Sequence, residues 1–100
     1  MVDEIFLKPI GKDDQGWEFL AKFSGQTHQV SITTKYWKQV THENVSPMET
    51  INLALSVALE EKITADLPPT FSAESLVKRL PMIEKRLRSL SQAEAAANPH

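Results

Sequence analysis

The chain has 100 residues, enough for one domain, and its 41% apolar and 24% charged residues are typical of a folded globular protein. It has no cysteine, which excludes a disulfide scaffold, a cysteine nucleophile and a thiolate-ligated metal. The net charge of −2 excludes a uniformly basic nucleic-acid-binding surface. The N-terminal MVDEIFLKPI carries acid where a signal peptide carries base, and no stretch is suited to span a bilayer. We therefore expect a cytoplasmic protein that does not associate with membranes.

The first third of the chain shows the patterns of three short strands. Residues 4–10 (EIFLKPI) predict the first strand, and Pro9 makes it an edge strand or marks the strand's end, because proline cannot donate to a ladder. Residues 17–23 (WEFLAKF) and 28–34 (HQVSITT) alternate apolar and polar side chains with the period of a half-buried strand. We predict a three-stranded antiparallel meander with an inner face formed by Trp17, Phe19, Phe23, Val30 and Ile32.

A short helix and a long helix follow the meander. Residues 34–41 (TKYWKQVT) predict the short helix because their apolar side chains recur at spacings of three and four. In the next segment Ser46 is a good N-cap and Pro47 suits the first helical position, which predicts a helix over 47–63. Its apolar arc is wider than one sheet face needs, because Leu53 and Val57 form a second stripe. The helix is therefore either sandwiched inside the domain or exposes this stripe to a partner.

The C-terminal part predicts a kinked helical segment. Residues 73–80 and 82–90 are helical in pattern, and one apolar stripe continues across Pro81 between them. Residues 92–100 have no apolar side chain larger than alanine, so we expect a flexible tail. The prediction is an α+β fold in one domain over 1–91, with a three-stranded antiparallel meander, a short helix, one long helix and the kinked segment.

No group of residues has the pattern of a catalytic, metal or nucleotide site. His28, His42 and His100 lack a second ligand at a metal-binding spacing. Asp13 and Asp14 lack the further oxygen ligands of a calcium loop. The three glycines form no phosphate-binding motif. We therefore predict a protein that is not an enzyme and that has no metal and no cofactor.

A protein-interaction module is the function that these patterns favour. The unusually wide apolar arc of the long helix predicts a contact surface for another protein or for a second copy in a homodimer. The candidate interface residues are Leu53, Val57 and Trp37.

A basic C-terminal segment suggests an alternative function. Residues 76–90 carry five basic side chains against Glu84 alone. Such a cluster can contact phosphates, as in a nucleic-acid-linked regulator of the antitoxin or repressor type. A solvated helix face explains the same pattern, and charge patterning favours that interpretation. The candidate anion or nucleic-acid contacts are Lys78, Arg79, Lys85, Arg86 and Arg88.

Four short motifs follow one another after the predicted hairpin. They are YWKQVT at 36–41, VSPME at 45–49, LEE at 59–61 and a Phe-led segment with an internal proline at 71–81. In this order they resemble small bacterial proteins of unknown function in which a β-hairpin precedes a helix capped by V-S-P-x-E. The resemblance spans nearly the whole chain and implies the same order of elements. It implies no activity.

Overall fold

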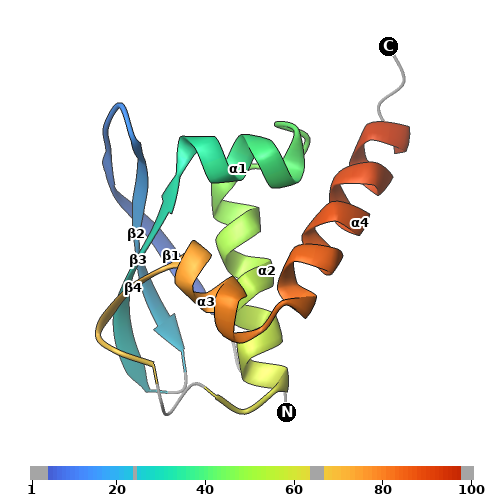
Figure 1. The fold of residues 1–100 in the computed structure, drawn as a ribbon. Helices are drawn as coiled ribbons and strands as arrows, with labels where there is room; N and C mark the ends of the chain where they lie inside the picture. Colours follow the sequence, from blue (N-terminus) through green and yellow to red (C-terminus); the bar gives the residue numbers. More distant parts are fainter. Residues whose placement is uncertain (1–4, 24, 64–66, 98–100) are drawn as a thin grey trace.

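Four strands and four helices make up the computed structural model, which describes residues 5–23, 25–63 and 67–97 (Figure 1). The predicted α+β class is confirmed. The strands are β1 (Phe6–Lys12), β2 (Gly16–Phe23), β3 (Gln26–Thr33) and β4 (Thr70–Ser72). The helices are α1 (Thr34–Thr41), α2 (Pro47–Glu60), α3 (Ala73–Arg79) and α4 (Met82–Ala97).

The sheet has the strand order β1-β2-β3-β4. Strands β1 to β3 form the predicted antiparallel meander, whereas β4 is a fourth strand that pairs parallel to β3. The amide of Gln29 donates to the carbonyl of Pro69 at 2.8 Å at the start of this pairing. A strand of three residues has no alternation to detect, and its partner lies about forty positions earlier, so the sequence did not predict it.

Strand β1 is irregular and begins later than predicted. It covers Phe6–Lys12 rather than 4–10, and residue 4 lies outside the described residues. Its register with β2 shifts between Pro9 and Gly11, which marks a β-bulge. Strand β3, by contrast, begins at Gln26, two residues earlier than the predicted 28–34, and ends at Thr33.

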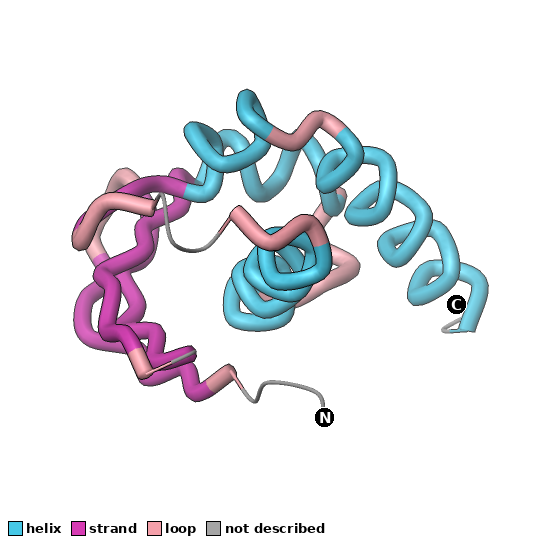
Figure 2. The backbone as a smooth tube through the Cα atoms, turned by 90° about the horizontal axis from the view of Figure 1, so that it is seen from below, coloured by secondary structure: helices cyan, strands magenta, loops and turns pink. Residues whose placement is uncertain are grey.

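The helices lie on one face of the sheet, and α2 lies between that face and α4, whereas α1 and α3 also contact the strands directly (Figure 2). The Ser46 hydroxyl accepts from the Glu49 amide at 3.1 Å and Pro47 opens the helix, as predicted. The helix ends at Glu60 instead of 63. Both sides of its apolar arc are used inside the molecule, because α2 packs against β1 and β3 on one side and against α3 and α4 on the other.

Helix α4 is longer than expected. It runs to Ala97, so the first six residues of the predicted tail 92–100 are helical, while 98–100 lie outside the described residues. Leu80 ends α3 and Pro81 separates it from α4, so the kinked segment consists of two helices. The hydroxyl of Ser91, which is 2% exposed, donates to the carbonyl of Thr41 and fastens α4 to the end of α1.

The core is one cluster between the sheet and the helices. Its members come from β2, β3, β4, every helix and the segment before β4. The predicted inner face is largely confirmed, although Trp17 is only partly buried and Ala21 joins the buried set. No helix in the described ranges combines the length and apolarity needed to cross a membrane. The largest fully buried side chains include Ile32, Ile51, Leu55, Leu76, Ile83 and Leu87.

Candidate interaction surface

The second stripe of α2 does not form an exposed surface. Val57 is 0% exposed and Leu53 is partly buried against the core. The prediction that Val57 contributes to an interface is therefore wrong, because α3 and α4 pack against α2 and complete its enclosure. Of the two alternatives for the wide apolar arc, burial inside the domain is the correct one.

Trp37 serves to join elements within the molecule. Its indole Nε1 donates to the Val45 carbonyl at 2.7 Å. Its ring meets the ring of Trp17 edge to face, with 5.0 Å between the centroids. The ammonium of Lys12 lies 5.8 Å from the centre of the Trp17 ring. Trp37 thus connects α1 to the hairpin and to the segment before α2, which accounts for its aromatic character without a partner.

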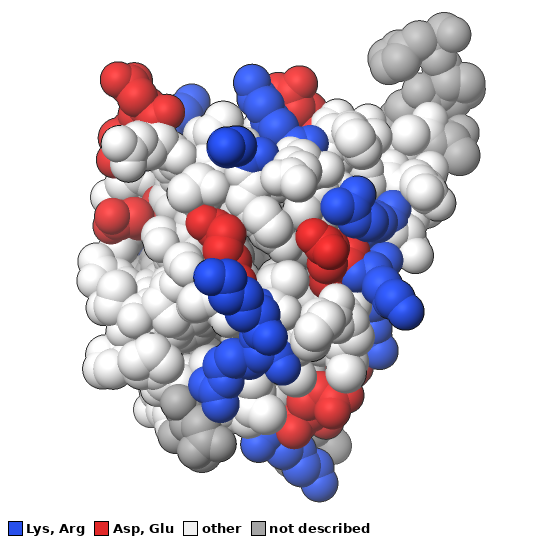
Figure 3. Space-filling model, in the orientation of Figure 1, with Lys and Arg blue, Asp and Glu red and all other residues white. Residues whose placement is uncertain are grey.

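The five basic C-terminal residues do not form one continuous patch. Arg86 pairs with Glu60 at 2.8 Å, and Arg88 pairs with Glu84 at 3.6 Å. Lys78, Arg79 and Lys85 are exposed. Figure 3 shows acidic side chains between the basic ones on the helical face, so the positive charge there is interrupted.

The two described histidines have structural positions. His28 is 5% exposed and its ring stacks on Phe23 with a centroid separation of 5.0 Å. Its Nδ1 lies 2.8 Å from the Pro68 carbonyl and its Nε2 lies 3.0 Å from Gln26 Oε1. His42 ends α1 in the left-handed conformation with φ 51°, and His100 lies outside the described residues. His28 thus holds the segment before β4 against β3.

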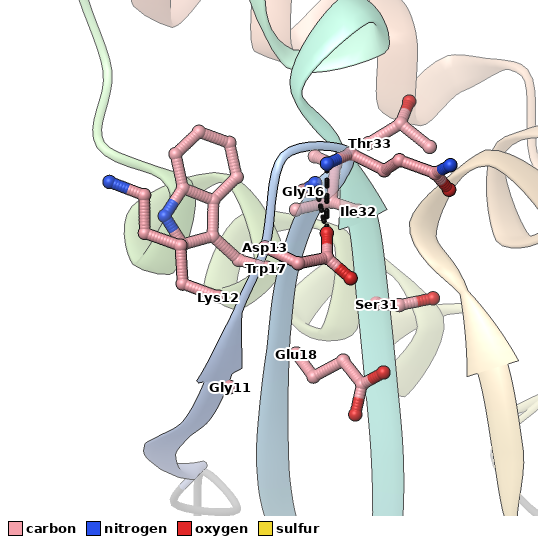
Figure 4. Close-up of a pocket in the computed structure, with 10 residues that line it drawn as sticks. Gly11, Lys12, Asp13, Gly16, Trp17, Glu18, Ser31, Ile32 and Thr33 are labelled. Carbon is pink, nitrogen blue, oxygen red and sulfur yellow. Dashed lines mark hydrogen bonds between the residues drawn. The ribbon is translucent and has the colours of Figure 1, made fainter.

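A shallow depression of about 380 Å³ lies at the tip of the β1–β2 hairpin (Figure 4). Asp13 Oδ1 faces it but is already occupied, because it accepts from the amides of Gln15 and Gly16 at 2.8 and 3.0 Å. Glu18 and Ser31 line the other side of the hairpin from Trp17. Across the described residues no group of three metal-ligating side chains comes together. The Asp13 carboxylate thus stabilises the turn, and the depression lacks a nucleophile paired with a base.

Two buried polar side chains, one from α1 and one from α3, lie near charged residues of α4. The Tyr36 hydroxyl and Glu74 Oε1 are buried, and neither has a hydrogen-bond partner within the described structure. Burial, followed by the charges of Glu84 and Glu74, raises the pKa of Tyr36 to about 12, against the opposing charge of Arg88. This arrangement keeps the phenol neutral and makes it a poor proton donor at ordinary pH.

The outer face of the sheet is the surface that the helices leave open (Figures 1 and 2). Residues directly opposite each other in neighbouring strands share a face. Phe6 lies opposite Lys22, and Lys8 lies opposite Leu20, so these four side chains form a compact block on β1 and β2. We call this block the outer patch. Phe6 is 62% exposed, which is a large fraction for an aromatic side chain.

The sequence contained a signal for the outer patch. Leu20 is the apolar exception on the polar side of residues 17–23, and Phe6 lies on the opposite side of its strand from Leu7. No protein-family model, curated protein or solved structure matches the chain. A function can therefore be proposed only from the geometry of the described residues.

Proposed function

We propose that the protein is a small, non-catalytic protein-interaction module that binds through the outer face of its sheet. The observation that supports this proposal is that the described helices lie on one face of the sheet, while the other face carries the exposed Phe6 diagonally across from the half-buried Leu20. Ile10, the unpaired residue at the bulge, is also 43% exposed. Exposed apolar side chains that cluster on one face are typical of contact sites.

The edges of the sheet are less suited to self-association. Strand β1 carries Lys8, Pro9 and a bulge, and each of these features discourages pairing with another strand. At the other edge, β4 has only three residues. These features favour a contact through side chains on the face over a contact through backbone pairing.

Site-specific photocrosslinking in the cells that produce the protein tests this proposal. A photoreactive residue at position 6 should capture a discrete protein, whereas the same residue at position 92, on the exposed side of α4, should not. Light scattering over a range of concentrations shows whether the captured partner is a second copy. Equal crosslinking at both positions, or none at position 6, would overturn the proposal.

A further inference from the structure

We infer that the outer patch binds an extended segment of another protein that carries acidic and apolar side chains. This inference rests on the proposed function and specifies its partner. The patch combines two exposed lysines with two apolar side chains in adjacent positions on β1 and β2. An acidic and apolar segment complements both properties at once.

The charge of the patch is unbalanced. Lys8 and Lys22 lie diagonally across the block, and the ion pairs of the described residues include neither of them. Among the described residues, the nearest acidic side chain on this face is Glu18, which lies opposite Gly11 one row further toward the hairpin tip. Two lysines that form no ion pair within the described part of the chain, beside exposed apolar surface, attract a ligand that carries carboxylates and favour a negatively charged partner.

The spacing of the patch matches an extended chain. Along one strand, side chains on the same face repeat at about 7 Å, and side chains opposite each other are separated by about 5 Å. Phe6 and Lys8 on β1, and Leu20 and Lys22 on β2, therefore alternate apolar and basic groups at the repeat of an extended peptide. A peptide that alternates acidic and apolar side chains can meet both kinds of group.

Two other occupants fit less well. A second copy placed patch to patch would gather four lysines in one small contact, and like charges repel. Single-stranded nucleic acid is held by several aromatic platforms on which successive bases stack. The patch has one aromatic side chain, Phe6, and its other apolar member is Leu20.

Selection from a displayed library of random peptides on the full chain tests the inference. We expect the enriched peptides to combine Asp or Glu with apolar residues. The double variant Lys8→Glu, Lys22→Glu should weaken their binding at least tenfold. The matched double variant Lys78→Glu, Lys85→Glu makes the same change in net charge on α3 and α4, and it should change binding less than twofold. Phe6→Ser should also weaken binding, without unfolding the protein.

The possible outcomes separate the two proposals. One outcome is enriched peptides that lack acidic residues and whose binding depends on Phe6 but not on Lys8 and Lys22. This outcome would overturn the partner class and leave the proposed function standing. No enrichment, or enriched peptides that depend on Lys78 and Lys85, would overturn both. Binding of labelled oligo-thymidine that is lost in Lys8→Glu, Lys22→Glu, without any peptide binding, would replace the protein partner by single-stranded nucleic acid.

Discussion

The side chain of Tyr36 combines a ring that suits its position with a hydroxyl that does not. Its ring packs against the core at the junction of three helices, but its hydroxyl is buried without a partner. A buried hydroxyl that forms no hydrogen bond loses its interactions with water and gains none in return. The aromatic pattern of 34–41 predicted the helix and the inward ring, but the environment of the hydroxyl depends on α3 and α4.

Replacing Tyr36 by phenylalanine should therefore stabilise the protein. We expect the free energy of unfolding to rise by about 1 kcal/mol, because the variant keeps the ring and removes the unpaired hydroxyl. Urea unfolding at neutral pH measures the change. A loss of stability would show that the hydroxyl has a favourable interaction, for example with a bound water molecule.

The raised pKa of Tyr36 also predicts a dependence on pH. The folded state keeps the phenol protonated up to about pH 12, whereas the unfolded chain loses the proton near pH 10.0. The stabilisation from this linkage is complete below pH 10.0 and is lost as the pH rises toward 12. The stability of the wild type should thus fall relative to Tyr36→Phe in that range. Since the chain has one tyrosine, its absorbance titration reports this group directly, and a midpoint near 10 in the folded protein would contradict the prediction.

Gly16 is required by close backbone packing. A Cβ atom at this position would lie 2.1 Å from the Ile32 carbonyl oxygen, so Gly16→Ala forces β2 and β3 apart. We expect a loss of about 3 kcal/mol, as for an overpacked core. Gly11→Ala in the same hairpin is the control, because its Cβ would meet only Glu18 Cβ at 3.9 Å. Equal losses of thermal stability in the two variants would disprove the steric explanation.

At the scale of elements, the features that depend on local sequence could be predicted, whereas the features that depend on tertiary contacts could not. The Ser46 cap and Pro47 marked the start of α2, and the alternation in 17–23 marked β2. The burial of Val57 could not be predicted from the local sequence, because it depends on where α3 and α4 pack. The role of Ser91 was hidden for the same reason, because its partner Thr41 lies fifty positions away.

Ser91 should contribute measurably to the docking of α4. Its hydroxyl donates to the Thr41 carbonyl and accepts from Asn44 Nδ2 at 3.2 Å, and Ser91→Ala removes both bonds. We expect a loss of about 1–2 kcal/mol, because the carbonyl stays buried without its donor. Ser89→Ala, at an exposed position of the same helix, should change stability by less than about 0.5 kcal/mol. Urea unfolding compares the two, and equal effects would show that α4 does not depend on this contact.

At the scale of the whole molecule, the distribution of charge bears on the alternative function. The sequence showed five basic residues close together, but it could not show that Arg86 reaches Glu60 on a different helix. Pairing reduces the positive potential that remains for phosphate contacts. The candidate surface accordingly moves from the C-terminal helices to the open face of the sheet, which only the assembled fold defines.

The protein should not bind duplex DNA in a salt-sensitive manner through its C-terminal helices. Fluorescence anisotropy of labelled DNA at low salt should show no binding that Lys78→Glu, Lys85→Glu removes, because acidic side chains interrupt this surface. Arg86→Glu, Arg88→Glu should behave the same way. Steep salt-dependent binding that either variant abolishes would instead support a nucleic-acid-linked regulator.

The late position of β4 in the chain has a consequence for synthesis. Strands β1 to β3 and helices α1 and α2 leave the ribosome first, and β4, α3 and α4 follow. Until those last elements emerge, the side of α2 that they cover has nothing packed against it. Val57, which is fully buried in the folded protein, is then part of an apolar surface that is exposed to water. For that interval the growing polypeptide presents a target for chaperones and for neighbouring nascent chains.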